Sequence, residues 1–271
     1  LVVSHADHAT ATRGSGSERL RRTVRATLVR SHLRVASGEN FASWPGGLLA
    51  HSLAQAFEVT QNPKDLEAVV GYGKWWMRTH QDKAPPNLDY VANGRLLLWL
   101  FHRSGSQDLL DAAKSMAAYV DNARKSPTGL MPYRQVAPST IYIDSVGIVT
   151  PFIADYASAS PDPHLSSIAA SQIGAFMERG MDSVSGLPYH AFDDVTGEKL
   201  GAPGWGRGTG WLLLGCSEML RGDASGRLFD QGLSDAYQAV CERVSEFQRP
   251  DGSFSWLLQA HDGPADASAT A

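Results

Sequence analysis

Two aspartates stand where a carboxyl group could take part in acid–base chemistry. Asp144 lies in the apolar segment 141–149, and burial among such neighbours disfavours the charged form of a carboxyl group and favours a proton donor. Asp89 follows the Pro-Pro-Asn-Leu sequence of residues 85–88. If both side chains face one cavity, their repulsion separates their pKa values, so that one stays charged while the other holds a proton near neutrality. The competing interpretation is that each aspartate caps the start of a helix, where Asn87 competes with Asp89.

The most informative short segment is residues 205–211, which read Trp-Gly-Arg-Gly-Thr-Gly-Trp. Its glycines miss the register of a G-x-G-x-x-G loop and no Gly-Lys-Ser/Thr follows, which excludes nucleotide binding. Tryptophan faces stack on sugar rings, and a guanidinium group pairs bidentately with a carboxylate. Trp205, Arg207 and Trp211 therefore predict a site for an acidic sugar. The alternative is a packing corner in which Arg207 has a structural role.

His190 lies among aromatic and acidic residues in segment 189–194. It is interpreted either as a cavity residue or as a hydrogen-bonded histidine of the core. The remaining histidines are scattered, without an H-E-x-x-H or C-x-x-C pattern, so we expect no catalytic metal. The chain also lacks the G-x-S-x-G elbow of a serine hydrolase.

Composition excludes several classes of protein. The chain has 271 residues, is 43% apolar and carries a formal net charge of −4. Non-specific binding to nucleic acid requires clustered Lys and Arg, which this balance does not supply. The two cysteines, Cys216 and Cys241, cannot form a disulfide scaffold and are expected as buried free thiols. No apolar stretch of about 18 residues lacks charge, so we expect no membrane partner.

The elements that must position these side chains are helices. Apolar residues recur at helical spacing in nine ranges, and a tenth helix is expected to begin near Asp266. No credible run of paired strands is present, so the predicted class is all-α. The nine ranges are 17–37, 46–59, 64–80, 91–103, 107–124, 145–159, 163–180, 208–221 and 227–248.

The loops between these helices contain a repeat. Residues 128–133, 185–190 and 251–256 each place a small polar residue before a glycine, followed by apolar and aromatic residues. The three glycines are spaced by roughly 60 residues, and each loop follows an amphipathic helix. A repeat of that length built from helix pairs predicts a toroid or solenoid of αα-hairpins.

The helices that follow the loops have mostly apolar bodies, which predicts an inner layer of buried helices. The starts of these helices would then line one mouth of the barrel, and they carry Asp89, Asp144, Trp205, Arg207 and Trp211. The five starts lie at residues 44–47, 87–90, 142–145, 204–207 and 266–269.

These pieces, in this order, resemble glycoside hydrolase family 105, the unsaturated rhamnogalacturonyl hydrolases, and more distantly the family 88 unsaturated glucuronyl hydrolases. The resemblance runs from about Trp44 to the end of the chain. Its most specific piece is the Trp-Gly-Arg-x-x-Gly-Trp motif. The others are residues 87–90 with Gly94 and Arg95, 142–144 with Pro151 and Phe152, 186–193, and 266–271, which looks like the family's acidic-x-Ser-x-Thr-Ala segment.

The resemblance implies an (α/α)6 barrel that removes a 4,5-unsaturated uronic acid from oligosaccharides made by polysaccharide lyases. The implied chemistry is hydration of a vinyl ether rather than ordinary hydrolysis between two flanking carboxylates. It requires no metal or organic cofactor.

The resemblance also implies a role for each site residue. Asp144 would be the general acid and then the base, and Asp89 its partner carboxylate. His190 and Arg207 would bind the sugar or water, and Trp205 and Trp211 would form stacking walls.

We expect residues 1–16 to be a flexible segment and residues 17–271 a single catalytic (α/α) domain that is incomplete at its C-terminus, because a six-hairpin ring needs further helices. The expected partner is a small oligosaccharide, and the expected location is the cytoplasm or periplasm. The sequence leaves the oligomeric state and the sugar on the aglycone side open. One alternative function is a noncatalytic sugar-binding toroid, which the incomplete C-terminus favours together with residues 145–149, since these lack the aromatic residue and Met expected from the resemblance. Another is a different (α/α)6 carbohydrate enzyme.

Overall fold

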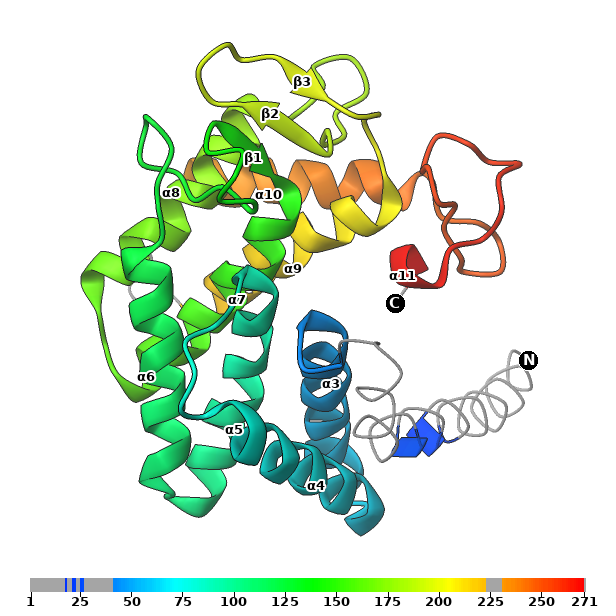
Figure 1. Cartoon of the computed structure of the whole chain (residues 1–271). Coiled ribbons are helices and arrows are strands. Elements are labelled where there is room, and N and C mark those ends of the chain that lie inside the picture. Colours follow the sequence, from blue (N-terminus) through cyan, green and yellow to red (C-terminus); the bar gives the residue numbers. More distant parts are fainter. Residues whose placement is uncertain (1–17, 19–20, 23–24, 27–40, 223–230, 271) are drawn as a thin grey trace, which may run out of the picture. The chain divides into compact units, whose positions relative to one another are not determined.

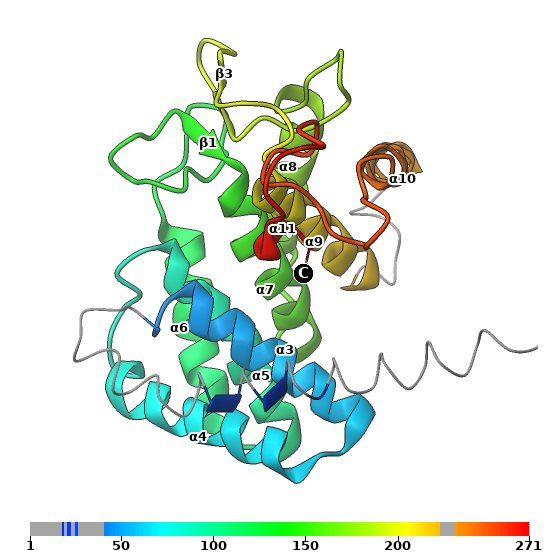
Figure 2. The same cartoon turned by 90° about the vertical axis from the view of Figure 1, so that its right-hand side faces the viewer.

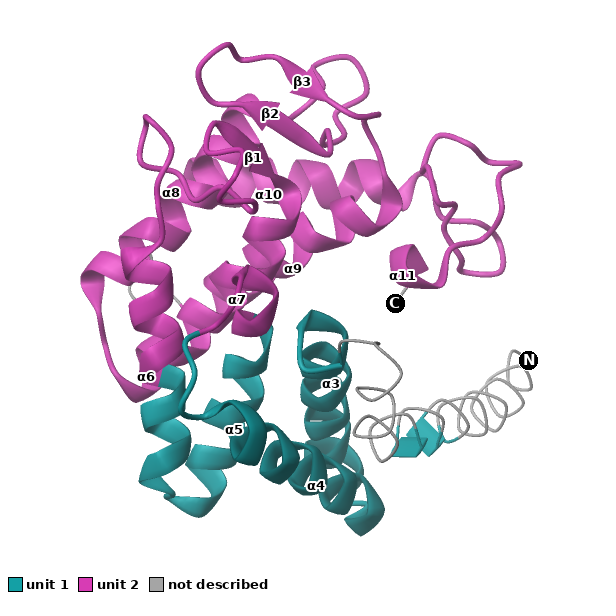
Figure 3. Ribbon diagram, in the orientation of Figure 1, with its two compact units in different colours: residues 1–84, 92–113 teal, residues 85–91, 114–271 magenta. Residues whose placement is uncertain are grey.

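The computed structural model describes residues 18, 21–22, 25–26, 41–222 and 231–270 (Figure 1). The predicted flexible segment 1–16 and most of the predicted helix 17–37 lie outside these residues. The chain forms two compact units (Figure 3). One contains residues 1–84 and 92–113, and the other contains residues 85–91 and 114–271.

The first unit is built from helices α3 (Trp44–Thr60), α4 (Pro63–His80) and α5 (Gly94–Ser104), and the start of α6 (Gln107–Asn122) belongs to it. Local sequence signals set the turn between α3 and α4. The side chain of Asn62 accepts a hydrogen bond from the amide of Lys64, and Pro63 occupies the first helical position, which suits its fixed φ. Helix α3 packs against both α4 and α5.

The second unit holds the rest of α6 and helices α7 (Ile143–Ala159), α8 (Pro163–Arg179), α9 (Gly206–Gly222), α10 (Gln231–Ser245) and the short α11 (Ala267–Thr270). A 3₁₀ turn, η1 (Leu88–Asn93), precedes α5, and the chain passes from one unit to the other within it. Within the described ranges, the predicted helices are confirmed to within a few residues at their ends. The range 91–103 is corrected, because its start belongs to the 3₁₀ turn.

Helix α7 is apolar on nearly all sides and packs against α8 and, most extensively, against α9 (Figure 2). This confirms the prediction of a buried helix body at this position. A close approach explains Gly147: a Cβ atom there would lie 2.4 Å from the ring of Trp211 on α9. The missing side chain lets the two helices pack with an indole ring against backbone.

The second unit also contains a small antiparallel sheet, so the expectation that no strands pair was wrong. Its strands are β1 (Thr140–Tyr142), β2 (Ala191–Asp193) and β3 (Lys199–Leu200), in that order. In the β1–β2 register, Tyr142 faces Ala191 and Thr140 faces Asp193. Strands of two or three residues are too short to show an alternating pattern, which explains why the sequence does not reveal them.

The repeated loops share one backbone feature, which supports the repeat found in the sequence. Gly129, Gly186 and Gly252 all have positive φ, between 69° and 89°. Only glycine adopts this conformation without strain, so it closes the tight turn at the same point of each loop. No helix in the described ranges is both long and apolar enough to cross a membrane.

Candidate active site

The β1–β2 ladder places Asp144 beside His190. The amide of Ile143 donates to the carbonyl of His190 at 3.0 Å, which continues the ladder into the first turn of α7. The next residue, Asp144, then reaches the ring, with its Oδ2 3.1 Å from Nε2 of His190. The Asp144 side chain is 16% exposed and that of His190 37%. This contact can carry a proton in either direction, since Nε2 donates when it is protonated and accepts when it is not.

Asp89 lies in η1, where its Oδ1 accepts a 2.5 Å hydrogen bond from the Tyr133 hydroxyl. Burial raises the pKa of Asp89; the hydrogen bond from Tyr133 opposes the rise, the charge of Asp144 adds to it, and Arg134 opposes it. Burial and the bond to Asp89 also raise the pKa of Tyr133, so its hydroxyl stays a donor. The charge of Asp144 therefore acts on the carboxyl group of Asp89.

Aromatic rings connect the two carboxyl groups. The ring centroid of Tyr133 lies 6.1 Å from that of Tyr142, and Tyr142 lies 5.1 Å from His190, both in edge-to-face geometry. Asp89 and Asp144 thus stand at the two ends of a short chain of contacts. Such edge-to-face pairs restrict how each ring is oriented.

The same chain continues to the Trp-Gly-Arg motif at the start of α9. The Trp205 ring lies 4.5 Å from that of His190, and the guanidinium of Arg207 lies 4.7 Å from the centre of the Trp205 ring. Both side chains are partly exposed. Gly208 lies beneath the Trp205 ring, because a Cβ atom there would come within 2.5 Å of it. This glycine therefore accommodates a side chain of the protein itself.

Trp211 has a different position from the other motif residues. It is 5% exposed and packs on Gly147 in the contact between α7 and α9. Its ring therefore packs between the two helices and presents little surface to a sugar. For Trp211 this favours the alternative interpretation of the motif as a packing corner.

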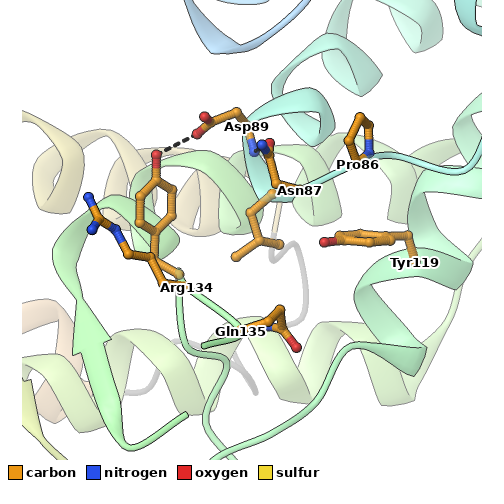
Figure 4. Close-up of a pocket in the computed structure, with 8 residues that line it drawn as sticks. Pro86, Asn87, Asp89, Tyr119, Arg134 and Gln135 are labelled. Atoms are coloured by element: carbon orange, nitrogen blue, oxygen red, sulfur yellow. Dashed lines mark hydrogen bonds between the residues drawn. The ribbon is translucent and has the colours of Figure 1, made fainter. Parts of the chain in front are cut away.

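A cavity of about 320 Å³ opens beside Asp89 (Figure 4). Among the six predicted site residues, Asp89 is the one that lines it. The lining combines phenol, amide and guanidinium groups and comes from η1, the two residues before it, α6 and the loop after α6: Pro86, Asn87, Leu88, Asp89, Tyr119, Tyr133, Arg134 and Gln135. Among the described residues, no three His, Cys, Asp or Glu side chains gather as a metal site would require.

Comparison with known proteins identifies the family. Residues 20–271 match the family model of Glycosyl Hydrolase Family 88. The chain belongs to this family. Membership makes it a glycosidase, in agreement with the order of motifs found in the sequence.

Individual proteins and solved structures are also similar to this chain. The chain is 25% identical over 240 residues to the unsaturated rhamnogalacturonyl hydrolase YesR of Bacillus subtilis, covering 84% of this chain and 67% of that protein. A family 105 glycoside hydrolase from C. acetobutylicum superposes with a TM-score of 0.76 at 18% identity, over 92% of this chain and 73% of its own.

A second structure, a possible family 105 member from Klebsiella pneumoniae, superposes with a TM-score of 0.78 at 17% identity, over 99% of this chain and 73% of its own. These superpositions confirm the predicted all-α fold class.

Three residues that support the site were missed at the sequence level. Tyr133 holds Asp89, and Gly201, with φ of +82°, lies against His190, where a Cβ atom would meet that of His190 at 2.9 Å. Gln172 binds the backbone of Met131, two residues before Tyr133. The repeated loop already singled out the segment with Tyr133. A lone Gln in an amphipathic helix carries no such signal.

Proposed function

We propose that this protein removes a 4,5-unsaturated uronic acid from the non-reducing end of lyase-generated oligosaccharides. The observation that carries the proposal is the pair of interacting carboxyl groups, Asp89 and Asp144, on a connected chain of contacts that ends at Arg207. Family 88 membership and the similarity to a protein named as an unsaturated rhamnogalacturonyl hydrolase support it.

The proposed reaction is hydration of the vinyl ether of the unsaturated sugar. An acid delivers a proton to C4, and positive charge develops at C5 and the ring oxygen. Water adds to C5 while the conjugate base of the same acid removes a proton from it. The resulting hemiketal opens, and the bond to the next sugar breaks. One carboxyl group that is protonated near the working pH, and ionised afterwards, serves both steps.

Asp144 is the proposed acid and base, because His190 contacts its carboxyl group and can exchange or steady the proton. Asp89 is the proposed partner. Two nearby carboxylates resist being charged together, so the pair retains one proton to a higher pH than an isolated carboxylate would.

Arg207 and Trp205 are the proposed recognition residues for the uronic acid. The planar guanidinium matches a carboxylate in a bidentate pair, and the indole offers an apolar face to a sugar ring. Their mutual stacking at 4.7 Å holds both next to His190. Trp211 is left out of this recognition set because it is buried.

The test is loss of the unsaturated-uronate absorbance when the protein is incubated with lyase-generated disaccharides, beginning with unsaturated rhamnogalacturonan disaccharide. Asp144→Asn should lower kcat by at least about 10³-fold, since it removes the acid and base together. Asp108→Asn, on an exposed residue in the first turn of α6, is the matched control and should keep full activity. Saturable binding without turnover by the wild type would instead support a noncatalytic sugar-binding protein. Full activity of Asp144→Asn would refute the assigned roles.

A further inference from the structure

We propose that Tyr133 and Gln172 are positioning residues that together hold the carboxyl group of Asp89 in place relative to Asp144. The inference rests on the proposed function for its chemical meaning. Its structural content is a hydrogen-bond relay, buried at Gln172 and part-buried at Asp89, that joins the segments on which the two aspartates depend.

The first link is the bond from Tyr133 to Asp89. At 2.5 Å it is a short O–H···O contact to a carboxyl oxygen, and it is drawn dashed to Asp89 in Figure 4. It occupies Oδ1, which leaves Oδ2 as the oxygen available to a substrate or to the proton of the pair. Hydroxyl and carboxyl group are 44 residues apart in the chain, so the bond depends on the loop that carries Tyr133.

The second link fixes that loop. Gln172 of α8 is 1% exposed, and its side-chain amide binds both backbone groups of Met131. Its Oε1 accepts from the Met131 amide at 2.8 Å, and its Nε2 donates to the Met131 carbonyl at 3.0 Å. This two-point clamp mimics a strand partner and holds the backbone two residues before Tyr133.

The third link reaches the segment of Asp144. The second donor of Gln172 Nε2 goes to the hydroxyl of Ser145 at 2.9 Å, and that hydroxyl donates to the carbonyl of Tyr142 at 2.7 Å. Ser145 follows Asp144 directly in the first turn of α7. One buried amide therefore ties the loop of Tyr133 to the turn of Asp144, with both of its donors and its acceptor used.

The relay differs from ordinary helix packing, because polar groups of two segments converge on the side-chain amide of Gln172. An apolar side chain at position 172 could fill the same volume, but it would leave the backbone groups of Met131 without their partner. A buried network in which every member is satisfied specifies one arrangement of the segments it joins.

Removal of the Tyr133 hydroxyl should be visible in the titration of Asp89. The groups that act on Asp89 are Tyr133 and Arg134 of the loop and Asp144 of α7; Tyr119 of α6 lies within reach of its charge, and His190 faces Asp144. Among them, the Tyr133 bond lowers the pKa of Asp89 because it stabilises the charged form. In Tyr133→Phe that pKa should rise, and the pH–rate profile should move to higher pH.

The deciding experiment compares Tyr133→Phe with Tyr156→Phe in the full chain. Tyr156 is a buried tyrosine on α7, and the helix rise places it about 18 Å from Asp144 along the helix axis. Its variant therefore controls for the loss of a tyrosine hydroxyl away from the site. We expect Tyr133→Phe to lower kcat roughly 10-fold or more with a smaller change in KM. Carboxyl ¹³C NMR should show an upward shift of the Asp89 midpoint, and Tyr156→Phe should show neither change.

A second variant, Gln172→Met, tests the relay itself. The Asp89 midpoint isolates the part of the relay that runs through Tyr133. Gln172→Met alone should raise that midpoint, and adding it to Tyr133→Phe should raise it no further, because the bond that Gln172 positions is already gone. A further rise in the double variant would overturn the relay. An Asp89 midpoint that is unmoved in Tyr133→Phe would overturn the inference whether or not the protein turns over the substrate. Absence of turnover in a wild type with the expected NMR shift would instead refute the proposed function alone.

Discussion

At the scale of single residues, Asp89 is a carboxyl group held at a cost to stability. Its pKa is raised by burial and, in part, by the charge of Asp144. A carboxyl group with a raised pKa binds its proton more tightly in the folded than in the unfolded state. Stability therefore falls as pH rises from the unfolded pKa, near 3.8, through the folded pKa. Functional sites commonly hold groups that lower the stability of the fold but are needed for activity.

This predicts that Asp89→Asn has a higher Tm than the wild type at neutral pH, by a few degrees at most. The advantage should disappear below the unfolded pKa, where both side chains are neutral. Thermal melts at several pH values measure this. A Tm of Asp89→Asn below that of the wild type at neutral pH would show that ionised Asp89 stabilises the fold.

Asp89→Asn and Tyr133→Phe should shift the pH–rate profile in opposite directions. Asp89→Asn removes the neighbouring charge that helps the pair to keep its proton, so the basic limb of the pH–rate profile should move to lower pH. Tyr133→Phe should move it to higher pH. The pH dependence of kcat in both variants measures this. If the basic limb moved in the same direction in the two variants, the coupling of the two aspartates would be contradicted.

The two tryptophans of the motif should separate recognition from packing. Trp205→Ala should raise KM about 10-fold, because it removes the partly exposed ring between His190 and Arg207, at little cost to stability. Trp211→Ala should lower stability by about 3–5 kcal/mol, because it empties the space above Gly147. Kinetics and denaturant melts of both variants measure the difference. A stable Trp211→Ala with a raised KM would reverse the assignment.

At the scale of elements, the small sheet sets the position of His190. Strand β3 ends next to Gly201, which lies under the His190 side chain with φ of +82°. An alanine there would be strained in its backbone and would displace the ring from Asp144. The sheet therefore acts as a positioning device although it contains few residues.

Gly201→Ala should lower kcat about 10-fold or more by displacing His190. Gly197 is the matched control, since it has φ of +73° in the preceding turn and an added Cβ atom there would meet no side chain within 4 Å. Gly197→Ala should share the backbone strain, of order 1 kcal/mol, and keep its activity. Equal activity losses in both variants would indicate that strain alone, rather than contact with His190, is responsible.

At the scale of the whole molecule, ties between distant segments hold the site-bearing unit together. The buried carboxylate of Asp194 accepts hydrogen bonds from the amide and hydroxyl of Thr128 and from the guanidinium of Arg179. It thereby joins a repeated loop, the end of α8 and the residue that follows strand β2. Burial acts to raise the pKa of Asp194, but the hydrogen bonds from Ser126, Thr128 and Arg179 outweigh it and lower this pKa.

Asp194→Ala should lower the free energy of unfolding by roughly 2–3 kcal/mol, since hydrogen bonds to a charged group are lost. A lowered folded pKa stabilises the wild type above the unfolded value of 3.8, and this contribution is lost as pH falls through the folded pKa. The deficit of Asp194→Ala should therefore be largest near neutrality and shrink in acid. A deficit that is constant with pH would point to packing instead.

Local patterns in the sequence were sufficient for the helices and for the order of motifs. Helical periodicity, caps such as Asn62 and the glycines of the repeated loops act over a few residues, so they can be recognised without the fold. The motifs of Asp89, Asp144, His190 and Arg207 are local in the same way, and the structure places these four residues in one connected region.

Contacts between residues far apart in the chain decided the rest. The bond of Tyr133 to Asp89 spans 44 residues and that of His190 to Asp144 spans 46, and the second depends on a sheet too short to leave a pattern. Burial separated Trp205 from Trp211 although both belong to one motif, because a helix turns the two rings toward different neighbours. The raised pKa of Asp89 likewise depends on burial and neighbouring charge, and these exist only once the chain has folded.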